Sequence, residues 1–168
     1  LTIAADTYFG EWYTEKRKKS GMIDALQKYG YTHSFEKVAS LLPAIDYNIV
    51  NFEGVLTNET DSVYKDKIEF LLHANPDETI KELKRRNIHA VMLGNNHCMD
   101  FDYEIGLQSR DTFVKHGFET FGFGKNINEA NKPLCLECSG KKVIIFNGYW
   151  FRGYRSKLNH YASENSAG

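Results

Sequence analysis

Polar side chains of one chemical kind follow three short apolar segments of the chain. Asp6 follows residues 1–5, Glu53 follows residues 46–52, and Asn95-Asn96-His97 comes soon after residues 89–93. Carboxylate oxygens, an amide carbonyl and an imidazole nitrogen can bind Mn, Mg, Zn or Fe, and this mixture does not select one of them. His97 could equally act as a general acid for a leaving group.

The three apolar segments are predicted to be buried strands with helices between them. The expected helices cover Ser34 to Leu42, with Ser34 as N-cap, a segment from Asn75-Pro76 to near Asn87, and Glu104 to Lys115. This alternation predicts an α/β fold with a largely parallel central sheet flanked by helices. The carboxyl ends of parallel strands lie along one edge, so the polar residues are expected to converge there.

Residues 119–123 are expected to form a further short strand, and residues 133–137 and 142–146 a strand pair around the turn at Ser139-Gly140.

Two carboxylates at one sheet edge repel each other unless a cation lies between them. A divalent metal would remove this repulsion, and two metals bridged by Glu53 would form a site for phosphoester hydrolysis. The alternative is structural, because Asp and Asn after a strand are also favoured in caps and turns. Asp100 is expected to cap the helix that follows it.

Composition excludes several classes of protein. The chain has 168 residues, is 42% hydrophobic and carries a net charge of −1, which gives no electrostatic case for nucleic-acid binding. No run of apolar residues is long enough to span a membrane. The basic run from Lys16 to Lys19 is typical of a solvated surface. Cys135 and Cys138 form a CxxC without the second ligand pair of a zinc site.

Three segments resemble a known family. They are IAADTYFGE at residues 3–11, NFEGVLTN at residues 51–58, and the stretch from Leu93 to Pro133 that begins LGNNHCMDFD. These segments are similar to the bacterial capsule-synthesis (CapA-type) proteins, which include the poly-gamma-glutamate synthesis subunit. Ala5 stands where that family's first motif normally has Gly.

The resemblance implies a calcineurin-like metallophosphoesterase fold, four-layered αββα in the full family. It implies that Asp6, Glu53 and Asn96 bind a divalent metal and that His97 is the catalytic acid. Asn95 and Lys67 are the residues expected to bind substrate. The metal would be Mn, Zn, Fe or Mg.

The family's later His-containing motifs, which complete the metal site, do not occur after Phe146. We therefore expect residues 1–168 to be a single CapA-like domain that is incomplete at its C-terminus. A missing half would leave apolar core exposed and favour a homo-oligomer. Because the sequence is expected to be trimmed at its termini, both the cytoplasm and the cell envelope stay open as locations.

The expected function is capsule or poly-gamma-glutamate biosynthesis with a metal-dependent phosphoesterase-like site, acting on a phosphoester or an anionic polymer. One alternative is a non-catalytic module that binds a polymer or a protein partner and carries a vestigial site. Another is a plain α/β small-molecule binder whose polar residues only form caps.

Overall fold

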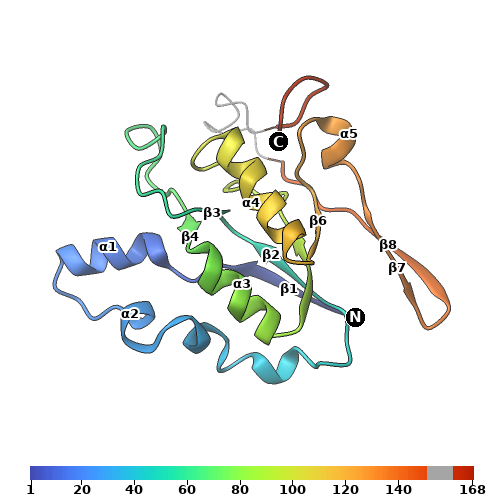
Figure 1. Ribbon diagram of the computed structural model, residues 1–168, viewed down its shortest axis with the longest axis horizontal. Coiled ribbons are helices and arrows are strands. Elements are labelled where there is room, and N and C mark those ends of the chain that lie inside the picture. The colour runs from blue at the N-terminus through green and yellow to red at the C-terminus, as the bar shows by residue number, and fades with distance from the viewer. Residues whose placement is uncertain (151–160) are drawn as a thin grey trace.

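A parallel four-stranded sheet forms the centre of the computed structural model, which describes residues 1–150 and 161–168 (Figure 1). The strand order is β1-β2-β5-β6, and every neighbouring pair is parallel. The strands are β1 (Thr2–Thr7), β2 (Asn48–Phe52), β5 (Ile88–Met92) and β6 (Glu119–Phe121). The predicted α/β class and the parallel central sheet are therefore confirmed.

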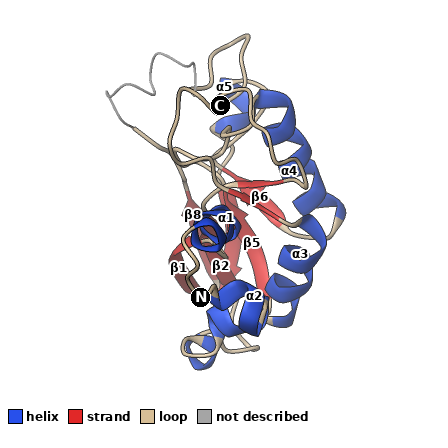
Figure 2. Cartoon of the chain, turned by 90° about the vertical axis from the view of Figure 1, so that its left-hand side faces the viewer, coloured by secondary structure: helices blue, strands red, loops and turns tan. Residues whose placement is uncertain are grey.

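Five helices are described in the connections. They are α1 (Glu11–Lys19), α2 (Ala25–Tyr29), α3 (Pro76–Arg85), α4 (Tyr103–Lys115) and α5 (Ile127–Ala130). Figure 2 shows α3 and α4 along the same face of the sheet. Helix α3 begins as predicted, because the Asn75 side chain accepts a hydrogen bond of 3.0 Å from the backbone N–H of Glu78 and Pro76 follows the cap.

The two faces of the sheet contribute to separate clusters, because successive side chains of a strand point in opposite directions. In β2, Val50 and Phe52 belong to the larger cluster, which also contains residues of α3 and α4. Ile49 belongs to a second cluster with Ala90 and Phe121. These strand residues have almost no exposed surface, so the central strands are fixed on both faces.

Two small strand pairs complete the fold. The predicted antiparallel pair is present as β7 (Leu134–Cys138) and β8 (Lys141–Ile145), and in Figure 1 it extends away from the main body. Leu134 joins the second cluster, so the pair is anchored to the sheet at this end. A short parallel pair, β3 (Val55–Leu56) and β4 (His73–Ala74), was not predicted.

The helix predicted from Ser34 to Leu42 is wrong. The structure has two short 3₁₀ turns there, Tyr31–Phe35 and Ala39–Leu41. Phe35 and Leu42 are buried, but Val38 is 42% exposed and Leu41 is 67% exposed. The four apolar positions therefore do not form one buried helical face, and the segment lacks the packing that a short helix requires.

Candidate functional site

A bulge in β1 brings Asp6 beside Asn51. The pairing of β1 with β2 shifts between Ala4 and Asp6, so Asp6 pairs with Asn51 and Ala5 is the extra residue. The Asn51 Nδ2 donates a hydrogen bond of 2.5 Å to the Asp6 Oδ1. The Asp6 carboxylate is thus held at the end of its strand, although residue Asp6 itself is exposed.

Glu53 follows β2 immediately and extends the contact with β1. Its backbone N–H donates to the carbonyl of Thr7 at 3.1 Å. The next residue must be small, because a Cβ on Gly54 would lie 2.9 Å from the carbonyl oxygen of Leu72 and Gly54 has a φ of +141°. The Glu53 side chain is partly exposed and its Oε1 lies 3.7 Å from the Nε2 of His97.

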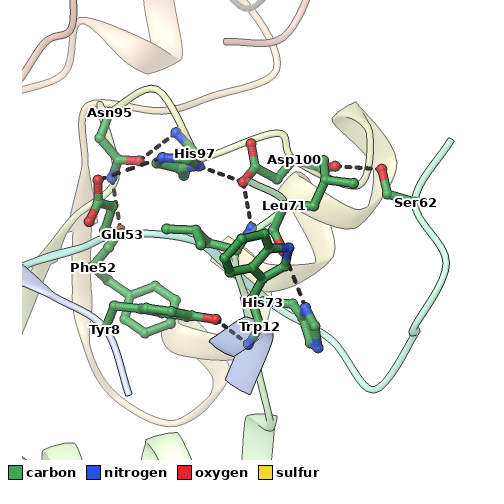
Figure 3. A network of polar contacts seen from close by, with 11 residues as sticks. Tyr8, Trp12, Phe52, Glu53, Ser62, Leu71, His73, Asn95, His97 and Asp100 are labelled. Carbon is green, nitrogen blue, oxygen red and sulfur yellow. Dashed lines mark hydrogen bonds and ion pairs between the residues drawn. The ribbon is translucent and has the colours of Figure 1, made fainter. Parts of the chain in front are cut away.

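The imidazole of His97 is fixed from its other nitrogen. The His97 Nδ1 lies 2.5 Å from the Oδ2 of Asp100, whose side chain has no exposed surface (Figure 3). The same Oδ2 accepts a hydrogen bond of 2.6 Å from the backbone N–H of Leu72. An Nδ1–H donated to Asp100 leaves Nε2 as the nitrogen that faces Glu53.

The expectation that Asp100 caps the next helix is wrong. Asp102 caps α4 instead, because its Oδ1 accepts a hydrogen bond of 2.7 Å from the backbone N–H of Ile105. Asp100 is buried within the loop of residues 93–102, which joins β5 to α4, and it pairs with His97. The signal that could have identified this pair is the His-x-x-Asp spacing, since a turn brings residues three apart into contact.

Asn95 connects the loop of residues 93–102 to the end of β2 through hydrogen bonds. Its Nδ2 donates to the carbonyl of Phe52 at 2.8 Å, and its Oδ1 accepts from the backbone N–H of His97 at 2.9 Å. Asn95 and His97 are buried, and Asn96 between them is half-buried. A link of 3.3 Å from the Asn95 Nδ2 to the Asn51 Oδ1 joins this loop to the Asp6 side of the edge.

Asn147 supports the same loop from a distant segment and was not singled out in the sequence. Its Oδ1 accepts from the backbone N–H of Gly94 at 2.5 Å, and its Nδ2 donates to the Gly94 carbonyl at 3.4 Å. A Cβ on Gly94 would lie 2.7 Å from this Oδ1, so the contact requires glycine. A polar residue just after the apolar run of residues 142–146 was the available signal.

Lys67 lies outside this group of contacts. It is exposed in the segment between β3 and β4, and its backbone N–H donates to the carbonyl of Tyr64 at 2.8 Å. We call Asp6, Glu53, Asn95 and His97 the strand-edge site. Among the described residues, no ion pair or hydrogen bond joins the Lys67 side chain to it. Its expected role in substrate binding stays a prediction.

The donor set has the right chemistry for a divalent metal but does not form a closed site. Within residues 1–150 and 161–168, no three His, Cys, Asp or Glu side chains gather closely enough to hold a metal ion. Asp6 contacts Asn51, whereas Glu53 faces His97. Metal binding by Asp6, Glu53 and Asn96 therefore stays a prediction, and the contacts described above are those of the side chains alone.

A half-buried tyrosine, Tyr8, lies just after β1. Burial raises the pKa of the Tyr8 hydroxyl well above its ordinary value, and its oxygen accepts a hydrogen bond of 2.7 Å from the backbone N–H of Trp12. The neutral phenol therefore persists at physiological pH and anchors the start of α1.

The sequence profile of the family described as bacterial capsule synthesis protein PGA_cap matches residues 4–167. The chain belongs to this family. The capsule synthesis resemblance seen in the three motifs is therefore confirmed, and the parallel sheet agrees with the metallophosphoesterase-like fold that it implied. No curated protein matches the chain. In the part of this capsule synthesis protein that the structure describes, no helix has the length and apolar character needed to cross a bilayer.

Proposed function

We propose that this capsule synthesis protein cleaves a phosphoester bond and that His97 donates the proton to the leaving oxygen. The pairing of the His97 Nδ1 with the buried Asp100 at 2.5 Å carries the proposal. A histidine held by a carboxylate through one nitrogen is oriented to transfer a proton through the other. Nε2 is that nitrogen, and it lies at the strand edge beside Glu53.

The proposed step follows from this orientation. Protonated His97 gives its Nε2 proton to the leaving-group oxygen as the phosphorus–oxygen bond breaks. Water supplies the new oxygen on phosphorus and releases one proton to solvent, and solvent returns a proton to His97 before the next turnover. The other imidazole proton stays on Nδ1, which donates it to the Asp100 carboxylate in a hydrogen bond. Asp100 thereby acts as a positioning residue. Asp6, Glu53 and Asn96 are the proposed ligands of a divalent metal, and Asn95 a proposed substrate contact.

The test of proton donation is turnover of phosphomonoester and phosphodiester chromogenic substrates, with Mn²⁺, Zn²⁺ or Mg²⁺ supplied. We expect His97→Gln to lower turnover by a factor of about 10² to 10⁴. His33→Gln is the matched control, because His33 is exposed and contacts Glu36 and Tyr29, which lie outside the proposed site. Equal loss in both variants, or no loss in His97→Gln, would reject the proposed acid.

The test of metal binding is thermal stability with Mn²⁺, Zn²⁺ or EDTA. A ligand at about 100 times its Kd stabilises the folded state by about 2.7 kcal/mol. We expect this stabilisation in the parent and in Glu59→Ala, whose residue is exposed, and not in Glu53→Ala. Stabilisation that persists in Glu53→Ala would place the metal elsewhere.

A non-catalytic module that binds a polymer or partner is the second candidate. The observation that favours it is the contact of Asp6 with Asn51 at 2.5 Å, separate from the contact of Glu53 with His97. It predicts binding of an anionic polymer such as poly-gamma-glutamate without turnover, and without any effect of His97→Gln on that binding.

A further inference from the structure

A cavity of about 330 Å³ lies between α1 and the segment that leads into β4, and it is lined by residues other than Asp6, Glu53 and His97. Three lysines and one glutamate are the charged residues of its wall, and the lysines are Lys16, Lys19 and Lys65. Trp12, His73 and Phe101 contribute aromatic rings. The wall therefore combines more lysines than carboxylates with aromatic ring surface, in a chain whose net charge is −1. Lys65 also pairs with Asp61, so Lys16 and Lys19 are the lysines considered below.

The lysines of the basic run of α1 are exposed, as predicted, and two of them line the cavity. Lys16 and Lys19 are three residues apart, lie on the same side of the helix and both line the cavity. Arg17 instead pairs with the buried Asp24 at 3.0 Å. Two positive charges of the run therefore line one cavity, whereas a third, on Arg17, forms an ion pair with Asp24 in the segment after α1.

The Lys16 ammonium is held in place on the cavity wall. Its Nζ lies 3.9 Å from the centre of the Trp12 ring, and 3.3 Å from the Oε1 of Glu69. The Trp12 ring in turn packs against Phe70, with ring centres 4.9 Å apart. A cation over an indole face is attracted by the ring, so the charge is positioned before any ligand arrives.

The cavity shares a wall with the support of His97. Leu71, His73 and Phe101 line the cavity, and the backbone N–H of Leu72 donates to the Oδ2 of Asp100 at 2.6 Å. Figure 3 shows Trp12, Leu71 and His73 close to this Asp100. The segment of residues 71–73 therefore contributes both to the cavity wall and to the support of Asp100.

We infer that this cavity is an anion subsite that binds the phosphate or carboxylate group of an organic ligand. The ammonium groups of Lys16 and Lys19 would contact the anion, and the ring of Trp12 would pack against the apolar part of the same molecule. Such charge-assisted contacts are among the stronger polar interactions in proteins. The inference does not depend on proton donation by His97.

Fluorescence of Trp12 tests the inference directly, in a chain that carries Trp150→Phe so that Trp12 is the remaining tryptophan. The probes are inorganic phosphate, phenyl phosphate and phenylacetate, with chloride added to hold ionic strength constant. We expect a saturable change with the aromatic anions. Saturation with phenyl phosphate alone would assign a phosphate group, and with phenylacetate alone a carboxylate.

The deciding comparison uses two double variants with equal loss of charge. Lys16→Gln with Lys19→Gln should weaken binding at least about tenfold, as expected for the loss of a charge-assisted hydrogen bond. Lys18→Gln with Lys28→Gln should not, because both lysines are exposed and neither lines the cavity. Lys19→Gln alone serves if the first double variant loses its fold by circular dichroism.

Glu53→Ala separates this inference from the proposed function. We expect it to retain anion binding even where metal binding or turnover is lost. No saturable signal with any probe, or equal affinities in the two double variants, would overturn the anion subsite whatever the outcome at His97.

Discussion

The Nδ1 of His97 lies 2.5 Å from the Oδ2 of Asp100, and the Asp100 side chain has no exposed surface. Two donors converge on that one oxygen, because the backbone N–H of Leu72 also reaches it at 2.6 Å. The hydroxyl of Ser62 donates to the Asp100 carbonyl at 2.6 Å. The orientation of the imidazole is therefore set by a buried carboxylate that is itself fixed by the neighbouring loop.

Asp100→Asn should lower phosphoester turnover about 100-fold or more while changing KM little, because the imidazole loses the carboxylate that fixes its proton and ring. The free energy of unfolding should also fall by about 1–3 kcal/mol, since a buried donor loses its charged acceptor. Turnover assays and urea denaturation measure the two effects. Asp111→Asn is the control, because the Asp111 side chain is 62% exposed. Unchanged turnover would limit Asp100 to a structural role.

Asn95→Ala should destabilise the fold by about 2–3 kcal/mol, because it leaves the carbonyl of Phe52 and the backbone N–H of His97 without the hydrogen bonds of 2.8 and 2.9 Å. Urea denaturation measures the loss. Asn131→Ala, at an exposed position, should change stability by less than about 0.5 kcal/mol. Similar values for both variants would show that the Asn95 bonds do not hold the loop.

Asn147→Ala should cost about 1–2 kcal/mol of stability, since the backbone groups of Gly94 lose both hydrogen bonds. Gly94→Ala should also destabilise the protein, because the added Cβ would lie 2.7 Å from the Asn147 Oδ1 and 2.8 Å from the Gly122 carbonyl oxygen. The Gly122 clash is with backbone, so Asn147→Ala should not rescue Gly94→Ala.

Thermal unfolding of the single and double variants tests this coupling. Gly148→Ala is the matched control, because a Cβ there has no atom within 4 Å. Full rescue in the double variant would mean that the side chain of Asn147 alone excludes the Cβ.

Ionisation of Glu11 should lower the free energy of unfolding as pH rises. Burial raises the pKa of its carboxyl above the ordinary value of 4.5, although the Tyr31 hydroxyl at 2.6 Å and the Asn75 N–H at 3.1 Å oppose this. From about pH 4.5 up to the raised folded pKa, the folded chain keeps a proton that the unfolded chain releases. Raising the pH through this window therefore favours unfolding.

Glu11→Gln should remove this part of the pH dependence, because glutamine does not ionise. The measurement is urea denaturation from pH 4.5 to pH 8, with the parent and the exposed-site variant Glu59→Gln as controls. Relative to both, Glu11→Gln should gain stability as pH rises. Parallel curves for all three chains would contradict the effect of burial.

The sequence by itself determined the α/β class, the parallel strands and the cap at Asn75. Apolar segments of strand length alternate with helical ones, and the cap depends on a side chain and a backbone N–H only three residues apart. It also predicted that Asp6, Glu53 and residues 95–97 follow strands. Strand pairing between β1, β2 and β5 then places these positions along one edge.

Only the tertiary structure decided which polar atoms meet at that edge. Asp100 pairs with His97 and does not cap the start of α4, because its buried carboxylate lies against the imidazole and the Leu72 N–H. Asn147 reaches Gly94 from a distant segment, and the bulge in β1 turns Asp6 toward Asn51. The contacts of Asn147, of Asp6 and of Asp100 with Leu72 depend on register and packing between segments far apart in the chain, which local sequence patterns do not encode.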